Sequence, residues 1–249
     1  MIVSRSWNIL AQIANKYRFM RRSKYGTLTA MVKQIAIDGP VASGKTTIGK
    51  QVSQLLNWRF LDTGLMYRAA TWLVLRDSIP LDADEEIVTI TSRSRMELKT
   101  RQGVETLIVN GEDITEKLRT YRIEKTVSQV SKVPGVREAL VCHQRQIASE
   151  GPIVMVGRDI GTVVLINAPL KIYLDASIDV RACRRFYEMS GNRDNPTLDL
   201  VKADIIRRDQ IDSDRTYSPL RPAKDAIVID TTQSPIQDVV NKIVGMVNL

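Results

Sequence analysis

Residues 39–46 have the sequence Gly39-Pro40-Val41-Ala42-Ser43-Gly44-Lys45-Thr46 and match the pattern G-x-x-x-x-G-K-[S/T] of a phosphate-binding loop. The preceding residues, 34–38, are predicted to form a short buried strand. Residues 47–56 are predicted to form a helix, because their apolar residues have helical spacing: Ile48, Val52, Leu55 and Leu56. The loop thus has the strand before it and the helix after it that a phosphate site requires and that a chance glycine turn would lack.

The composition of the loop explains how it would hold phosphate. Glycines allow backbone N–H groups to turn toward phosphate oxygens, and the N-terminus of the following helix adds partial positive charge. Lys45 can reach the β- and γ-phosphates, and the Thr46 hydroxyl can bind Mg²⁺. The loop therefore predicts a nucleoside triphosphate site without indicating the reaction.

The composition limits the classes to which the protein can belong. The 249 residues suffice for one sizeable α/β domain with an insert, or for two small domains. No run of about 18 apolar residues is present, so no transmembrane helix is predicted. Cys142 and Cys183 lack metal-ligand spacing and are predicted to be reduced thiols of a cytoplasmic protein. A single histidine, His143, excludes a His-rich metal site.

The formal net charge of +8 is concentrated at the N-terminus. Six of the 36 basic residues precede Met31, and none of the 28 acidic residues does. The rest of the chain is nearly neutral, which argues against a nucleic-acid-binding module. That module is the alternative from a different class, and it would require residues 31–249 to bind DNA or RNA with a steep salt dependence.

Residues 1–32 are predicted to be a basic extension of a folded domain at 33–249. The apolar residues of the extension have the spacing of a short amphipathic helix: Trp7, Ile9, Leu10, Ile13 and Ala14. Three interpretations stay open. The segment contains Arg and Ser but no acidic residue, as in an organelle transit peptide. It also suits a helix on a membrane surface. Alternatively, the start codon is assigned too early, because Met31 directly precedes the first strand.

Strand-like and helical patterns alternate along the rest of the chain. Further strands are predicted at residues 58–62, 153–156, 171–175 and 226–230. Such alternation predicts an α/β fold with a mostly parallel sheet covered on both faces. The last helix is predicted to have Ser234 as its cap and Pro235 in its first turn.

Residues 95–114 interrupt this alternation. Residues 95–99 alternate, and residues 105–109 are strand-like. Asn110-Gly111 is a strong hairpin-turn signal, because both residues tolerate positive φ. We therefore predict an antiparallel insert here, followed by helices from about residue 115 to 150 with a break at Pro134-Gly135.

Arginines gather at two places outside the loop. Arg158 and Asp159 directly follow the buried strand 153–156, and ligands of open α/β sheets bind at the carboxyl ends of the strands. Arg158 is therefore predicted to contact a ligand and not merely a surface carboxylate. The second group lies on the helices of residues 177–215 and predicts a basic lid that closes over ATP phosphates. A solvated charged surface is the alternative. The basic residues of this second group are Arg181, Arg184, Arg185, Arg193, Arg207, Arg208 and Arg215.

These and other motifs resemble those of bacterial-type cytidylate kinases over nearly all of residues 33–249. The matching segments are IAIDGP (35–40), LDTGLMYR (61–68), NGEDI (110–114), VSQV (127–130), VREAL (136–140), GRDIGTVV (157–164), Arg208-Asp209 with Asp212 and Arg215, and SPL (218–220). The resemblance implies a P-loop NTPase fold with three α/β/α layers and a mostly parallel sheet. It also implies an antiparallel insert that binds a nucleoside monophosphate at about 93–130 and a helical lid at about 181–196.

The resemblance implies a role for each site residue. Thr63, Arg68 and Arg158 would hold the CMP phosphate, and Ser128, Arg137 and Asp159 would recognise cytosine. Asp212 would accept from the ribose 2′-hydroxyl, with Arg208 nearby and Arg215 on the phosphates during transfer. The implied CMP contacts are Thr63, Tyr67, Arg68, Ser128, Arg137, Arg158, Asp159, Arg208, Asp212 and Arg215. The implied ATP contacts are Gly39, Pro40, Val41, Ala42, Ser43, Gly44, Lys45, Thr46, Thr47, Arg181 and Arg184. The implied catalytic residues are Lys45, Arg158, Arg184, Arg185 and Arg215.

The implied activity is transfer of the γ-phosphoryl group of ATP to CMP, and to dCMP, with Mg²⁺ held through ATP and Thr46. We expect a cytoplasmic monomer with small-molecule substrates, no nucleic-acid partner and no stable membrane association. The closest rival is another P-loop kinase that acts on a different nucleotide or metabolite. A GTPase is disfavoured because the guanine motif Asn-Lys-x-Asp is absent, since Asn241-Lys242 continues as Ile243-Val244.

Overall fold

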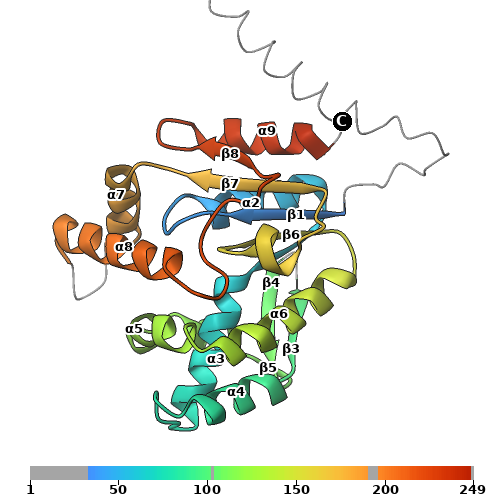
Figure 1. The fold of residues 1–249 in the computed structure, drawn as a ribbon. Helices are drawn as coiled ribbons and strands as arrows, with labels where there is room; N and C mark the ends of the chain where they lie inside the picture. The colour runs from blue at the N-terminus through green and yellow to red at the C-terminus, as the bar shows by residue number, and fades with distance from the viewer. Residues whose placement is uncertain (1–32, 102–103, 190–195, 248–249) are drawn as a thin grey trace, which may run out of the picture.

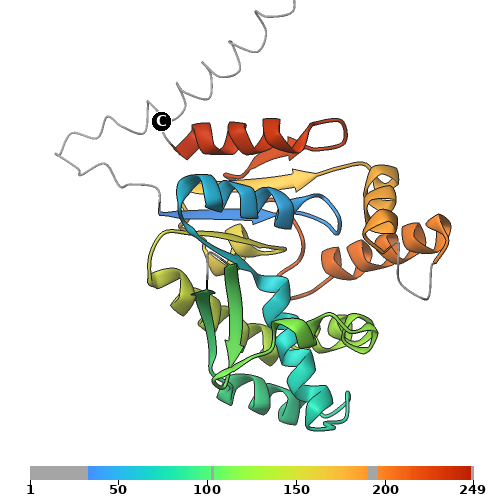
Figure 2. The same cartoon turned by 180° about the vertical axis from the view of Figure 1, so that it is seen from behind.

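The computed structural model describes residues 33–101, 104–189 and 196–247. The predicted extension of residues 1–32 and residues 190–195 of the predicted lid therefore lie outside the described residues. Within the described ranges the chain forms a five-stranded sheet, a three-stranded sheet and surrounding helices (Figures 1 and 2). Every helix in these ranges is too short or too polar to span a membrane.

The larger sheet is entirely parallel. Its strands, in spatial order, are β2 (Arg59–Asp62), β6 (Ile153–Gly157), β1 (Gln34–Asp38), β7 (Leu170–Asp175) and β8 (Ile227–Asp230). The strand that precedes the phosphate-binding loop thus lies at the centre, and all carboxyl ends share one edge of the sheet. Figure 1 shows α7 (Ile178–Met189) and α8 (Leu198–Ser213) beyond that edge. The predicted parallel sheet is confirmed.

Helices cover both faces of the larger sheet, as the sequence predicts. On one face, α2 (Lys45–Leu56) and α9 (Ile236–Val247) enclose a core that includes Ile35 and Ile37 of β1. On the other face, Ala36 belongs to a second core shared with α3 (Thr63–Arg76) and α6 (Pro134–Ser149). Successive residues of the central strand therefore point to opposite faces, as in any β-strand.

The antiparallel insert is also confirmed. It contains β3 (Met96–Arg101), β4 (Val104–Val109) and β5 (Glu112–Asp113). Asn110 and Gly111 join β4 to β5 with φ angles of 51° and 86°, the left-handed values that a tight hairpin needs. α4 (Asp84–Arg93) precedes the insert, and the buried residues of both belong to the core that includes α3. The insert is therefore built onto the main domain and has no core of its own.

Further elements complete the fold. α5 (Tyr121–Val130) ends shortly before Pro134 begins α6, as the predicted break requires. A single turn of π-helix, η2 (Ile160–Val164), follows β6, and a 3₁₀ turn, η1 (Thr115–Leu118), precedes α5. The hairpin of α7 and α8 has a small core of its own, formed by Ala182, Val201 and Ile205. α5, α7 and α8 each supply side chains to the site at the carboxyl edge of the sheet.

The last helix begins later than the sequence predicts. α9 starts at Ile236, and the N–H groups of Asp238 and Val239 donate to the Pro235 carbonyl. The Ser234 hydroxyl donates instead to the Asp230 carbonyl, at 3.1 Å. The prediction that Ser234 caps this helix is therefore wrong, because Ser234 lies one residue too far from the free N–H groups of the first turn.

Candidate active site

The loop between β1 and α2 has two positions whose backbone conformation favours glycine. Gly39 and Gly44 have φ angles of 151° and 91°. A Cβ atom at Gly39 would lie 2.1 Å from the Leu174 carbonyl oxygen, so a side chain does not fit there. Gly44 directly precedes α2, whose first N–H groups have no partner within the helix. The loop therefore presents a helix N-terminus to a ligand, as an anion site requires.

The Lys45 side chain folds back on this loop. Its Nζ donates to the Pro40 carbonyl at 2.5 Å and to the Ser43 hydroxyl at 3.3 Å. Burial lowers the pKa of Lys45 well below its ordinary value, and the positive charge of Arg158 lowers it further. A phosphate anion beside Nζ would favour the charged ammonium form, because opposite charges stabilise each other.

Thr46 faces the carboxyl end of β2. Its hydroxyl donates to Oδ2 of Asp62 at 2.8 Å, and Oδ1 of Asp62 accepts the Gly64 N–H at 2.9 Å and so caps α3. Across the described ranges no group of three His, Cys, Asp or Glu side chains is arranged to hold a metal ion. Thr46 and Asp62 nevertheless bring two oxygen ligands together at the loop, and the sequence prediction names only Thr46.

Asp38 links the loop strand to the segment after β6. Its two carboxylate oxygens accept the N–H groups of Ile160 and Gly161, each at 2.7 Å. These residues begin η2, directly after Arg158 and Asp159. A buried carboxylate on the central strand therefore fixes the backbone that presents both predicted ligands. The sequence identifies Asp38 as a strand residue but not this function.

Asp38 is expected to make the stability of the protein depend on pH. Burial raises the pKa of Asp38 from 3.8 to about 6, despite its two backbone hydrogen bonds. Because the folded value exceeds the unfolded one, ionisation costs stability as the pH rises from about 4 to about 6, in total roughly 3 kcal/mol. Asp38→Asn cannot ionise. The stability of the wild type relative to this variant should therefore fall across that range in urea unfolding, whereas a pH-independent difference would contradict the raised pKa.

Arg137 and Asp159 form a buried ion pair. Nη2 of Arg137 donates to Oδ2 of Asp159 at 2.6 Å, and the two side chains are 5% and 4% exposed. The Arg137 guanidinium lies over the Tyr67 ring, 5.1 Å from its centroid. The Tyr67 hydroxyl is buried and has no hydrogen-bond partner in the described part of the chain. The three predicted CMP contacts therefore form one rigid group with donors and acceptors.

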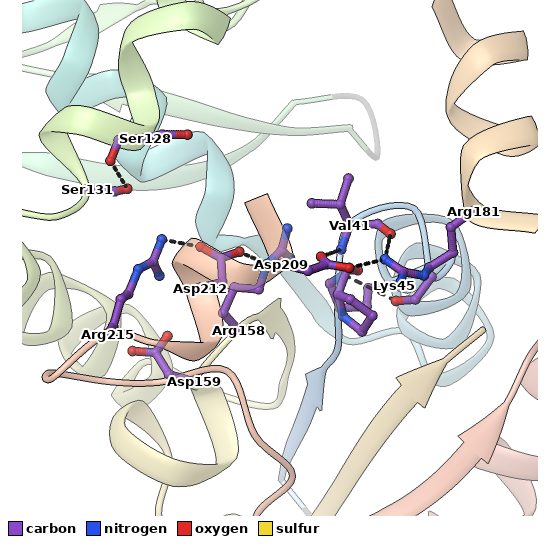
Figure 3. Close-up of polar contacts among 12 residues, drawn as sticks. Val41, Lys45, Ser128, Ser131, Arg158, Asp159, Arg181, Asp209, Asp212 and Arg215 are labelled. Carbon is purple, nitrogen blue, oxygen red and sulfur yellow. Dashed lines mark hydrogen bonds and ion pairs between the residues drawn. The ribbon is translucent and has the colours of Figure 1, made fainter. Parts of the chain in front are cut away.

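Asp212 of α8 lies between two arginines (Figure 3). Its Oδ2 accepts from Nε of Arg158 at 2.9 Å, and its Oδ1 pairs with Arg215. Each carboxylate oxygen has two lone pairs, so Asp212 can still accept from a further hydroxyl. The structure thus brings Arg158 beside Asp212 and Arg215, which are 54 and 57 residues further along the chain, and all three are predicted CMP contacts.

Three more of the predicted CMP contacts have hydrogen-bond or ion-pair partners within the protein. The Thr63 hydroxyl is buried and donates to the Val156 carbonyl at 2.9 Å, so its single proton is already engaged. Arg68 pairs with Glu124 at 3.0 Å. The backbone carbonyl of Ser128, on α5, accepts from the Ser131 hydroxyl at 3.1 Å (Figure 3).

Arg181 is bound to the loop itself. Its Nη1 donates to the Val41 carbonyl at 3.2 Å and pairs with Asp209 of α8 at 2.5 Å (Figure 3). Asp209 also accepts the Val41 N–H at 3.4 Å. This predicted lid arginine therefore holds α7, α8 and the loop together, an arrangement that the sequence does not predict.

The other two arginines of α7 have different surroundings. Arg184 donates to the hydroxyl and the carbonyl of Thr231, at 3.1 and 2.6 Å. Arg185 pairs with Glu188 at 3.2 Å and with Glu124 at 3.4 Å, and it lines the pocket. Of the three arginines on α7, Arg185 alone thus lines the pocket together with the predicted CMP contacts.

A pocket of about 270 Å³ collects most of the predicted residues. Those that line it are Val41, Ala42, Gly44, Lys45, Thr46, Thr47, Thr63, Tyr67, Arg68, Ser128, Arg137, Arg158, Asp159, Arg185, Arg208, Asp212 and Arg215. The predicted residues that do not line it are Gly39, Pro40, Ser43, Arg181 and Arg184. The lining residues that the prediction omits are Asp62, Gly64, Val127, Ser131, Gly157, Glu188 and Ile211. Several of the omitted residues lie next to predicted residues in the motifs LDTGLMYR, VSQV and GRDIGTVV, so their position in these motifs could have identified them.

Comparison with known proteins identifies the family. The model of the cytidylate kinase family matches residues 35–249. The cytidylate kinase of Geobacillus sp. (strain WCH70) is 44% identical over 215 residues, which are 86% of this chain and 96% of that protein. The cytidylate kinase of Bacillus subtilis (strain 168) is 43% identical over 213 residues, 86% of this chain and 95% of that protein. A solved shikimate kinase from Bacteroides thetaiotaomicron, 14% identical, has a TM-score of 0.46 and covers 87% of this chain and 98% of its own. The chain therefore belongs to the cytidylate kinase family.

Proposed function

We propose that this protein transfers the γ-phosphoryl group of ATP to CMP, and to dCMP, giving ADP and CDP or dCDP. One observation supports this most strongly: the phosphate-binding loop and a group of residues predicted to bind CMP, the phosphoryl acceptor, line the same pocket. The acceptor group includes Arg137, Asp159 and Asp212. A protein that only bound or hydrolysed ATP would not require this second group.

The buried pair of Arg137 and Asp159 is proposed to recognise the base. Asp159 can accept from the exocyclic amine of cytosine, whereas a carbonyl at that position, as in uracil, would face the carboxylate without a proton to donate. Arg137 and the Ser128 hydroxyl supply donors for the ring acceptors. Asp212 is proposed to accept from the ribose, with Arg208 beside it. A hydrogen-bonding site of this kind rejects a base that leaves its polar groups unpaired.

The arginines and Lys45 are proposed to bind the phosphates. Arg68 and Arg158 would hold the acceptor phosphate, and Thr63 would join them if its hydroxyl proton turned from the Val156 carbonyl to a phosphate oxygen. Lys45 would follow the γ-phosphoryl group. Because the attacking oxygen of CMP is already anionic, no strong general base is needed. Fixed cations, including Arg185 and Arg215, would stabilise the charge that spreads over the phosphoryl oxygens in the transition state.

Mg²⁺ is proposed to enter with ATP. The Thr46 hydroxyl and the Asp62 carboxylate fit this ion, because they are oxygen ligands 2.8 Å apart beside the loop. Mg²⁺ would neutralise charge on the β- and γ-phosphates. Asp62 holds Thr46 in place through their hydrogen bond and so orients its hydroxyl.

Two regions are proposed to complete the enzyme. Residues at about 93–130 would bind the monophosphate, and residues at about 181–196 would form a lid that excludes water from the transferred group. Arg181 and Arg184 would have to exchange their hydrogen bonds to the Val41 and Thr231 carbonyls for bonds to phosphate in order to contact ATP. We further propose a cytoplasmic monomer without nucleic-acid or stable membrane partners. Two exposed free thiols, Cys142 and Cys183, suit a reducing compartment.

The proposed function is tested by a coupled assay of ADP formation across a panel of monophosphates. We expect kcat/KM for CMP to exceed that for AMP and TMP by about 10³-fold or more, since the base site is built from buried hydrogen-bonding groups. dCMP and UMP in the same panel report on ribose and base selectivity. Equal use of AMP and CMP would reject the assignment, and ADP formation without any monophosphate would indicate an ATPase.

A further inference from the structure

Glu124 of α5 is a carboxylate at which three arginines meet. Its Oε1 accepts from Nε and Nη2 of Arg68, at 3.1 and 3.0 Å. Its Oε2 accepts from Nη2 of Arg185 at 3.4 Å and lies 3.9 Å from Nη1 of Arg208. The arginines belong to α3, α7 and α8, so this one side chain connects three helices to a fourth.

The three arginines line the pocket, whereas Glu124 does not. Glu124 therefore holds them from outside the pocket. The arrangement is clearest for Arg68, whose Nε and Nη2 edge is bonded to Glu124. The remaining nitrogen, Nη1, lies near Gly64, since a Cβ atom at Gly64 would be 3.1 Å from it. Gly64 itself lines the pocket, so Glu124 leaves the inner donors of Arg68 available to a ligand.

The charges around Glu124 make this arrangement stable. Burial alone would raise the pKa of Glu124, but the facing Arg68, Arg185 and Arg208 lower it below its ordinary value. The four side chains are 21–27% exposed, so solvent screens the charges only in part. Without the carboxylate, three guanidinium groups would repel one another at close range.

Arg68 depends on Glu124 more than the other two arginines do. Arg185 also pairs with Glu188 at 3.2 Å, and Arg208 also pairs with Asp204 at 2.8 Å. Within the described ranges, Arg68 has no carboxylate partner other than Glu124. Loss of Glu124 should therefore change the orientation of Arg68 more than that of Arg185 or Arg208.

We propose that Glu124 is a positioning residue for the acceptor phosphate, which it places by fixing the orientation of Arg68. This proposal rests on the proposed function, which assigns the acceptor phosphate to Arg68. Two further features fit it. Glu124 and Ser128 are four residues apart on α5 and so share one helix face, which directs both toward the acceptor region. The same carboxylate also ties Arg185 of the predicted lid to α3, so the acceptor side and the lid side of the pocket share one anchor.

A purely structural role makes a different prediction. Glu124 lies in the first turn of α5, where a negative charge stabilises a helix. If that were its only effect, its loss would lower the stability of the protein and leave the affinity for the acceptor unchanged. The two roles are therefore separated by measuring KM and the unfolding midpoint on the same variants.

The first test is Glu124→Gln, which keeps the shape of the side chain and removes its charge. With saturating ATP, we expect KM for CMP to rise about tenfold, because a misplaced Arg68 no longer meets the phosphate. Glu138→Gln is the matched control, since Glu138 is exposed on α6 and the change in net charge is the same. It should leave KM unchanged. An unchanged or lower KM in Glu124→Gln overturns the proposal, and a lower value would mean that Glu124 mainly cancels positive charge.

The second test combines this change with Arg68→Met. If Glu124 acts through Arg68, the double variant should have the KM of Arg68→Met alone, whereas two effects that multiply overturn the proposal. Glu124→Asp serves if the Gln variant does not fold. It keeps the charge but is one methylene shorter, so it should give a smaller rise in KM. A wild type that fails to phosphorylate CMP rejects the proposed function, whereas an active wild type with a normal Glu124→Gln variant rejects only the role of Glu124.

Discussion

Lys45→Ala is expected to lower kcat for phosphoryl transfer from ATP to CMP by about 10³-fold or more. Lys45 is the cation of the phosphate-binding loop, and its Nζ lies against the Pro40 carbonyl and the Ser43 hydroxyl. A γ-phosphoryl group bound to the loop would replace these two partners of Nζ. The Lys45 ammonium group would then stabilise the negative charge of the phosphoryl oxygens. The coupled assay at saturating ATP and CMP measures the loss.

The fold should survive this substitution, because charged Lys45 costs stability. Its side chain is 7% exposed, and burial lowers its pKa well below 10.5. A folded pKa below the unfolded value means that folding disfavours the charged form, and alanine removes that cost at neutral pH. We expect an unfolding midpoint in urea at least equal to that of the wild type. Turnover near the wild-type rate would refute the role of Lys45, and a large fall in the midpoint would show that the lost activity reflects unfolding.

The features that the sequence predicts well are those encoded by neighbouring residues. The strand, loop and helix around Lys45 follow from a glycine pattern between two hydrophobic patterns, and the structure has all three. The hairpin at Asn110-Gly111 follows from the φ angles that these residues tolerate, and both angles are positive. Strands that alternate with helices predict a parallel sheet, because parallel strands need long connections.

The features that the sequence does not predict are partnerships between distant residues. Arg181 and Arg184 lie on the predicted lid helix, yet both are bonded to backbone carbonyls, of Val41 and Thr231. Periodicity places an arginine on a helix face but does not determine which element packs there. The functions of Asp38 and Glu124 are hidden for the same reason, since each depends on N–H groups or arginines that the fold brings close.

The ion pair of Arg137 and Asp159 predicts the second large effect. Arg137→Met would leave a carboxylate that is 4% exposed without its cation, and Asp159→Asn would leave a guanidinium that is 5% exposed without its anion. Removal of one partner of a buried pair typically costs about 3–5 kcal/mol. We therefore expect each single variant to unfold at a much lower urea concentration than the wild type. Each should also lose selectivity for CMP over UMP.

The double variant, Arg137→Met with Asp159→Asn, separates the two effects. It leaves no unpaired charge at this position, so much of the lost stability should return, because an apolar and a neutral side chain can replace a buried pair at little cost. Selectivity should not return, since Asn at 159 can present either an oxygen or an NH₂ group to the base and Met at 137 has no donor. Urea unfolding and kcat/KM for CMP and UMP, measured on all four proteins, complete the cycle. A double variant that regained both stability and selectivity would show that the pair only supports the fold, whereas regained stability with selectivity still lost places base recognition in these two side chains.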